Sequence, residues 1–167
     1  PTSGLGPPPL AVGDRLRVGA ARAAASSSGW VDADPAYRWG SITDLRVVLG
    51  PRDDWFTADA LETLRHTEWE VSADLDRVGV RLSGPALARS HPEELPSEGI
   101  VAGAVQVPPS GHPIIFLADH PTTGGYPVIA VVVDADLDRA GQLRPGDRVR
   151  FSPIPASASW PPSQTVE

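Results

Sequence analysis

The chain has 167 residues and a formal net charge of -7. This length suffices for one well-buried domain plus tails, because a domain of about 150 residues buries about 70% of its extended-chain surface. The acidic balance, without a visible basic patch, disfavours a nucleic-acid or anionic-membrane partner. The absence of cysteine excludes disulfides, thiolate nucleophiles and zinc-thiolate sites.

The longest aliphatic run covers residues 128–133 and is far shorter than the roughly 20 residues of a membrane-spanning helix. No charged and then apolar leader opens the chain. We therefore expect no membrane association and a cytoplasmic location.

A short motif occurs twice, as VGDRLRV at residues 12–18 and as PGDRVRF at residues 145–151. Each copy has a Gly-Asp turn followed by a strand of alternating apolar and polar residues. The first copy either closes a preceding barrel-like unit, as the second closes this one, or is a common turn used twice. A low-complexity linker follows at residues 20–29. We expect residues 1–40 to hold the end of a preceding half-domain and this linker.

The main domain is expected over residues 41–154, followed by a Pro/Ser-rich disordered tail over residues 155–167. Alternating and apolar runs bounded by turn residues predict the strands. Periodic apolar residues behind Asp53 or Thr57 predict a helix through about His66. A second helix is expected over residues 134–143, and a single helical turn at 86–89. The predicted strands are 44–49, 68–73, 79–82, 100–107, 113–117, 128–133 and 147–151.

Short strands separated by turns, with only two short helices, indicate a mainly β domain, and a barrel in preference to a sandwich. The strand over residues 128–133 is apolar on both faces and is therefore expected to be central.

The segment from Asp119 to Pro127 joins two apolar strands and is longer than a hairpin requires. Loops of this kind often hold functional sites. Asp119 follows a strand directly, so that its carboxylate is expected at the mouth of the barrel as an acceptor or base. Gly124 and Gly125 allow backbone N–H groups to approach an anion. The alternative is a capped loop whose aspartate accepts only from its own amides.

Three further side chains belong to this hypothesis. Glu98 is a candidate second carboxylate, and Gln106 is a candidate amide reader. Arg77 can clamp a carboxylate in a bidentate fork or pair with Asp74 or Asp76 at the surface. The four histidines lack metal-site spacing, so no metal is expected.

Two stretches carry a family resemblance, DLDRVGVRLSGP at residues 74–85 and SEGIVAGAVQVPPSGHPIIFLADHPTTGGYPVIA at residues 97–130. They resemble the family that includes the C subunit of bacterial 5-oxoprolinase, allophanate hydrolase subunit 2 and the carboxyltransferase part of urea carboxylase. The likeness extends from about residue 41 to 153. The ordered string SEGI…AxQVPPxGxP…LAD…TTGGYP makes it specific.

The resemblance implies two similar cyclophilin-like β-barrel halves, of which this chain is the second with the tail of the first. The implied partners are that first half and a cognate protein similar to the B subunit of 5-oxoprolinase. The family commonly has lysine where this chain has Val128, and proline where it has Ala102. The pocket implied by the resemblance contains Glu98, Gln106, Asp119, Thr123, Gly124, Gly125 and Tyr126, with Arg77 nearby.

The family's substrates share a planar H–N–C=O unit, found in the 5-oxoproline lactam, in urea and in the ureido ring of biotin. The resemblance therefore implies a subunit of an ATP-dependent complex that cleaves an amide or lactam. We expect Asp119 or Glu98 to accept from the N–H group. Tyr126, Thr123 or Gln106 would donate to the carbonyl oxygen, and one such donor is typically worth about 3 kcal/mol.

The chain has no lysine, which excludes a P-loop, so ATP would be held outside the familiar motifs, or on or with a partner protein. One alternative is a biotin-dependent carboxyltransferase module that receives biotin from another protein. A second alternative is a non-enzymatic regulatory partner of a protein that resembles a kinase inhibitor.

Overall fold

The computed structural model describes residues 10–17, 19 and 42–156. Residues 1–36 and 37–167 form two separate units. The predicted linker at residues 20–29 lies outside the described residues, as does the predicted tail beyond residue 156. No helix within the described parts of the chain is long and apolar enough to cross a membrane.

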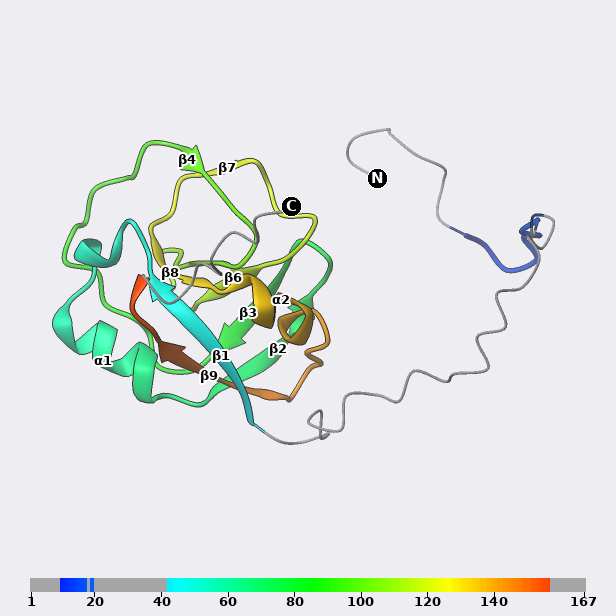
Figure 1. Cartoon of the computed structure of the whole chain (residues 1–167). Helices are drawn as coiled ribbons and strands as arrows, with labels where there is room; N and C mark the ends of the chain where they lie inside the picture. The colour runs from blue at the N-terminus through cyan, green and yellow to red at the C-terminus, as the bar shows by residue number, and fades with distance from the viewer. Residues whose placement is uncertain (1–9, 18, 20–41, 157–167) are drawn as a thin grey trace, which may run out of the picture. The chain divides into compact units, whose positions relative to one another are not determined.

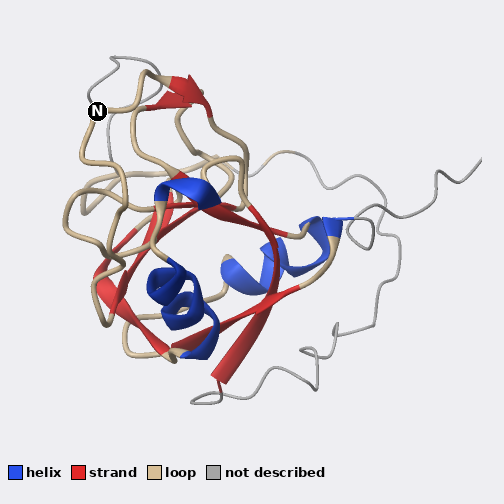
Figure 2. Ribbon diagram, turned by 90° about the vertical axis from the view of Figure 1, so that its left-hand side faces the viewer, coloured by secondary structure: helices blue, strands red, loops and turns tan. Residues whose placement is uncertain are grey.

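Seven strands form a closed barrel in the order β1-β8-β5-β6-β3-β2-β9, and Figures 1 and 2 show this ring from two sides. β1 and β9 pair in parallel, whereas the other neighbouring strands pair antiparallel. The mainly β barrel expected from the sequence is confirmed. The strands are β1 (Ile42–Leu49), β2 (Trp69–Leu75), β3 (Gly79–Ser83), β5 (Ala104–Gln106), β6 (Ile114–Phe116), β8 (Val128–Val132) and β9 (Arg148–Pro153).

Every second residue along a strand points into the barrel, and these inward-facing side chains fill its interior. Val80 and Leu82 of β3 are buried, whereas Arg81 between them faces outward and is exposed. Trp69 is completely buried, and its indole Nε1 donates to the carbonyl oxygen of Leu64 at 3.4 Å. β8 is almost entirely buried, in keeping with its apolar sequence, although a closed barrel has no central strand.

Helix α1 (Ala58–His66) lies across the barrel end that faces the viewer in Figure 2. It starts after Thr57, whose Oγ1 accepts from the Ala60 amide at 3.1 Å, which is the capping predicted for this residue. Leu64 is completely buried in the core. The single-turn 3-10 helix η1 (Asp53–Trp55) precedes α1, and α2 (Asp134–Ala140) connects β8 to the last turn.

A second, two-stranded sheet pairs β4 (Glu98–Gly99) with β7 (Thr123–Gly124). We call the two segments that carry it, residues 95–103 and 118–127, the flap. In Figure 1 these two strands stand apart from the barrel. The flap is fastened by a small apolar cluster outside the barrel wall, formed by Ile100, Ala104, Phe116 and Val128.

Two local predictions were wrong. The strand expected over residues 100–107 is reduced to β5, because the chain turns at Gly103, where φ is +83°. The helical turn expected at residues 86–89 is absent. Arg89 instead forms an isolated antiparallel bridge with Phe56, and the Leu87 amide donates to the Gly111 carbonyl oxygen at 2.9 Å. These pairings across the chain keep the segment extended.

The repeated sequence motif is also a repeated turn. Gly13 and Gly146 have φ values of +98° and +87°. In the first copy the Asp14 carboxylate accepts from the amide three residues earlier at 2.7 Å, and in the second the Asp147 carboxylate does so at 2.8 Å. The following apolar side chain is 72% exposed in the first copy, at Leu16, and its counterpart in β9 is fully buried.

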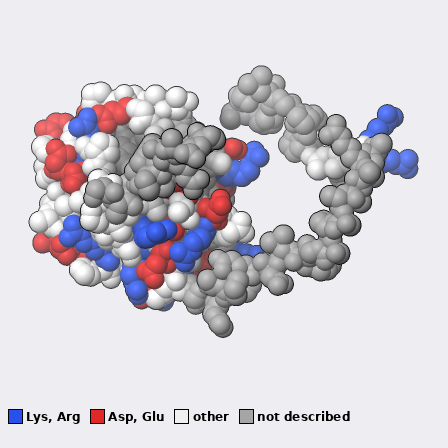
Figure 3. All heavy atoms as spheres, viewed as in Figure 1, with Lys and Arg blue, Asp and Glu red and all other residues white. Residues whose placement is uncertain are grey.

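A buried carboxylate joins α2 to β1. Asp136 is 2% exposed, and its oxygens accept from the Arg46 amide at 2.8 Å and from the Arg46 guanidinium at 2.9 and 2.8 Å. These bonds hold the pKa of Asp136 below its usual range. Around β1 in Figure 3, positive and negative side chains are intermixed, in keeping with this pair and the Arg150–Asp44 pair.

We expect Asp136→Asn to lower the free energy of unfolding at pH 7 by about 2 kcal/mol, because it weakens charge-assisted hydrogen bonds at a buried site. A carboxyl group with a lowered folded-state pKa stabilises the fold above its unfolded pKa of about 3.9, and this contribution is lost as pH falls through the folded pKa. Urea unfolding at pH 7 and pH 3 would measure both effects.

The difference between wild type and Asp136→Asn should therefore shrink at pH 3. Asp138→Asn on the exposed face of the same helix is the matched control, and we expect it to be nearly neutral at both pH values. An equal loss in the two variants would contradict the specific role of Asp136.

Candidate functional site

A groove with a volume of about 920 Å³ lies on the outer wall of the barrel. We call it the outer groove. Its apolar lining includes Ile114 and Phe116, and its polar lining includes Gln106, Tyr126 and Arg81. Asp74, near the end of β2, and Asp76, in the turn between β2 and β3, also line the groove. The groove therefore combines apolar side chains with several hydrogen-bonding groups.

Strand register explains why these side chains converge. Ile114 of β6 is paired with Arg81 of β3 on one side and with Gln106 of β5 on the other. Neighbouring strands lie about 4.8 Å apart, so the backbones of Arg81 and Gln106 are about 10 Å apart. Residues in one row face the same side of a sheet. Arg81, Ile114 and Gln106 thus form a continuous row across the groove.

Gln106 also connects the groove to the flap. It is 3% exposed, and its Nε2 donates to the backbone carbonyl oxygen of Tyr126 at 2.8 Å. The Tyr126 side chain is 45% exposed, and the Arg89 guanidinium lies 5.9 Å from its ring centroid. Arg89 also donates to the Val107 carbonyl oxygen, and burial lowers its pKa. Gln106 and Arg89 therefore contact Tyr126 through its carbonyl group and its ring.

A second depression, of about 650 Å³, lies between the β2–β3 turn, the loop after β6 and helix α2. We call it the lateral pocket. Asp119 and Arg77 line it, with the Arg77 Nη2 3.1 Å from Asp119 Oδ2. The two side chains are 47% and 89% exposed. The carboxylate therefore keeps much of its surface open to solvent.

The outer groove and the lateral pocket are neighbours. Arg77 lines the lateral pocket and Val78 the outer groove, and in the same way Leu117 lines the lateral pocket and Phe116 the outer groove. The Leu117 amide donates to the Val78 carbonyl oxygen at 2.9 Å. The wall between the two depressions is therefore this hydrogen-bonded pair of chain segments.

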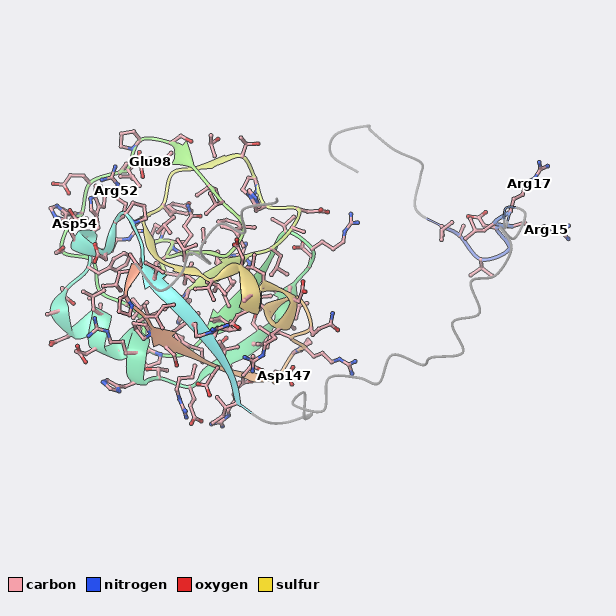
Figure 4. The ribbon with its side chains drawn as sticks, viewed as in Figure 1. Arg15, Arg17, Arg52, Asp54, Glu98 and Asp147 are labelled. Carbon is pink, nitrogen blue, oxygen red and sulfur yellow. The ribbon has the colours of Figure 1, made fainter. Side chains whose placement is uncertain are left out.

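Glu98 lies in the flap and is already paired. The Arg52 Nε donates to Glu98 Oε2 at 3.1 Å, and Arg52 Nη2 donates to Glu98 Oε1. The two side chains face each other in Figure 4. These hydrogen bonds hold the pKa of Glu98 below its usual range. The carboxylate is thereby a weaker base, and the pair ties β4 to the segment after β1.

The residues expected to form one pocket are thus distributed over three places. Gln106 and Tyr126 line the outer groove. Asp119 and Arg77 line the lateral pocket. The remaining members, Glu98, Thr123, Gly124 and Gly125, belong to the flap.

Sequence reasoning missed Arg81 as a lining residue. Its signal was present, since Arg81 is the polar member between two apolar residues of a predicted strand. Arg52 and Arg89 were also missed, and no local pattern marks them. Each reaches a partner far along the chain, 46 positions away for Arg52 and 37 positions away for Arg89, which contacts the Tyr126 ring.

The two positions that depart from the family pattern lie in different environments. Val128 is 7% exposed and packs in the apolar cluster beneath the flap, so it lines neither depression. Ala102 contributes to the lateral pocket.

The family model for the carboxyltransferase domain, subdomain A and B, matches residues 1–153. The chain therefore belongs to this carboxyltransferase-domain family. It is 34% identical to the 5-oxoprolinase C subunit of Escherichia coli over 139 residues, which cover 83% of this chain and 43% of that protein. It is 48% identical to the Haemophilus influenzae 5-oxoprolinase C subunit over 87 residues, covering 52% of this chain and 28% of that protein.

Among solved structures, the K. lactis urea amidolyase matches with a TM-score of 0.63 and 30% sequence identity. The match covers 68% of this chain and 8% of that protein. The chain thus spans less than half the length of these relatives.

Gly124 provides a test of the contact between the flap and the groove. A Cβ atom at Gly124 would lie 2.8 Å from Gln106 Nε2 and 3.3 Å from Ile100 carbons. We expect Gly124→Ala to break the bond between Gln106 and the Tyr126 carbonyl and to destabilise the protein by about 1–3 kcal/mol. Thermal unfolding and amide hydrogen exchange of residues 118–127 would measure this.

Gly125→Ala is the matched control. The nearest atom to a Cβ there is the Leu95 carbonyl oxygen at 3.4 Å, an ordinary contact. Equal effects of the two substitutions would show that the close packing of Gly124 on Gln106 does not hold the flap.

Proposed function

We propose that this chain is a subunit of an ATP-dependent complex that cleaves an amide or lactam, and that its outer groove binds the planar H–N–C=O unit. The observation that carries the proposal is that Gln106 and Tyr126 line one groove together with apolar side chains such as Ile114 and Phe116. Membership of the family and the likeness to 5-oxoprolinase subunits support it. Thr123 and Gly125, in the same flap, remain candidate binding residues.

In this proposal the Tyr126 hydroxyl donates to the carbonyl oxygen of the substrate. The Gln106 amide has one N–H group committed to the Tyr126 carbonyl, which fixes its orientation and leaves its oxygen as an acceptor. A substrate in the groove would lie next to the wall beyond which the Asp119–Arg77 pair sits. The substrate N–H group therefore donates to the Gln106 oxygen, and Asp119, whose carboxylate is more open than that of Glu98, remains a candidate proton acceptor on the other side of this wall.

The outer groove does not fit a nucleotide triphosphate. A triphosphate needs several cations or a row of backbone amides, and the groove contains one arginine beside Asp74 and Asp76. We therefore place ATP on, or together with, a partner protein, and assign this chain only the binding and orientation of the amide.

A second candidate function is a biotin-dependent carboxyltransferase module, which the family description favours. The ureido ring of biotin has the same H–N–C=O unit, so the same groove would bind it. Because the chain has no lysine, biotin would arrive on another protein. The third candidate is a non-enzymatic regulatory partner, which would bind a second protein without turnover.

The repeated turn supports a proposal about partners. Leu10 and Leu16 are 70% and 72% exposed, whereas their counterparts Leu143 and Val149 are buried in the barrel. We propose that residues 10–17 close a first barrel half of the same family, which covers these leucines. A protein similar to the B subunit of 5-oxoprolinase would complete the complex.

We expect Tyr126→Phe to reduce turnover by about 100-fold without lowering the melting temperature, because it removes one donor to a developing oxyanion at a half-exposed side chain. The measurement is ADP release by the protein co-purified with its partner subunits, with 5-oxoproline, urea or no substrate. Unchanged turnover would remove Tyr126 from the mechanism. ADP release that no amide stimulates, in the wild type, would favour the regulatory function.

Asp119→Asn tests the lateral pocket. Its only ion pair among the described residues is with exposed Arg77, so we expect a normal melting temperature together with lost ADP release. Asp59→Asn, an exposed aspartate on α1, is the control and should retain turnover. A lower melting temperature with residual turnover would instead assign Asp119 to holding the β2–β3 turn.

A further inference from the structure

We propose that Arg81 makes the outer groove selective for an amide that bears one carboxylate, and that it discriminates against neutral amides such as urea. This inference rests on the proposed function, because it names the substrate class of the same groove. It distinguishes between the two activities named among the chain's relatives, of which one acts on a carboxylate-bearing lactam and the other on urea.

The first observation is that Arg81 has no partner among the residues that the structure describes. Within residues 42–156, every other arginine takes part in an ion pair, a hydrogen bond or another interaction. Arg81 has neither an ion pair nor a side-chain hydrogen bond with any described residue, although the chain carries a net charge of -7. Acidic side chains are thus abundant, and the fold still leaves this guanidinium open.

The second observation is where this guanidinium lies. Arg81 is exposed, but it lines a concave groove and belongs to the same row as Gln106, with only Ile114 between them. A ligand that lays an amide against Gln106 and Tyr126 would extend over the apolar side chain of Ile114 toward Arg81. A ring with one carboxylate has this distribution of groups, apolar in the middle and polar at both ends.

The third observation concerns the two aspartates of the groove. The Asp76 Oδ1 accepts from the Val78 and Gly79 amides at 2.8 and 3.1 Å, which commits this carboxylate to its own turn. Asp74 lines the groove without pairing with Arg81. Its negative charge opposes a ligand with several anionic groups. One guanidinium next to one uncommitted carboxylate therefore suits a monoanion better than a phosphate chain.

The guanidinium suits a carboxylate because its planar fork can donate two parallel hydrogen bonds. Urea has no group that would use this fork, since its carbonyl oxygen is already assigned to Tyr126. A neutral amide would bind beside the Arg81 guanidinium without forming an ion pair, so the guanidinium would add nothing to its affinity. Discrimination then follows from the one interaction that only the anionic ligand makes.

The test compares 5-oxoproline with 2-pyrrolidinone, which is the same lactam ring without the carboxylate. Isothermal titration calorimetry would be run on the full-length protein co-purified with its partner subunits. We expect wild type to bind 5-oxoproline about 10- to 100-fold more tightly than 2-pyrrolidinone, the range for a charge-assisted hydrogen-bonded pair. In Arg81→Gln this ratio should fall to near one through weaker binding of 5-oxoproline, while 2-pyrrolidinone binds as before.

Arg81→Lys keeps the charge and loses the fork, so an intermediate ratio is expected. Arg148→Gln removes an equal charge from an exposed position on β9 and should leave the ratio unchanged. Equal binding of the two lactams by wild type, or equal weakening of both by Arg81→Gln, would overturn the role of Arg81 while leaving amide binding intact. If wild type binds neither lactam, the proposed function and this inference fail together.

Discussion

Parallel pairing of the first and last barrel strands is the constraint on which the rest of the structure depends. Six consecutive residue pairs, from Ile42–Arg148 to Val47–Pro153, close the ring. Closure leaves no free strand edge and fixes which side of each strand faces the core. The hydrogen bonds between Arg46 and Asp136 hold α2 against β1, and the turn at Gly146 and Asp147 leads the chain into β9. The inward-facing residues of β3, β6 and β5 belong to the core. The residues that alternate with them, Arg81, Ile114 and Gln106, therefore face outward and line the groove.

The site is built on the rigid wall and completed by the flap. Arg81 and Gln106 project from barrel strands, so their spacing is set by strand register. Tyr126 belongs to the flap, and its place depends on the Gln106 hydrogen bond and on the apolar cluster under β4 and β7. The Arg52–Glu98 pair adds a second attachment at the other side of the flap. The proposed substrate would thus contact both a fixed surface and a segment held by a few interactions.

The sequence predicts the barrel well because strand alternation and turn residues are local signals. Thr57 as a helix cap and the Gly-Asp turns are visible in the same way. The flap was missed because one positive-φ glycine, Gly103, interrupts an apolar run that otherwise reads as one strand. The candidate residues were expected in one pocket because the family resemblance implies one. Consecutive residues on an extended segment face opposite sides, so Phe116 and Leu117 line different depressions.

The direction of the two closing strands has a consequence for how the barrel can be joined to other domains. Because β1 and β9 run the same way, the polypeptide enters the barrel beside Arg148 and leaves beside Val47, where the Ile154 amide donates to the Val47 carbonyl oxygen at 2.8 Å. The two points are therefore at opposite poles, about 17 Å apart along the strand. Domains joined covalently to this one would attach at these two ends of the barrel. The side wall, where the ligand is proposed to bind, stays accessible to a separate protein.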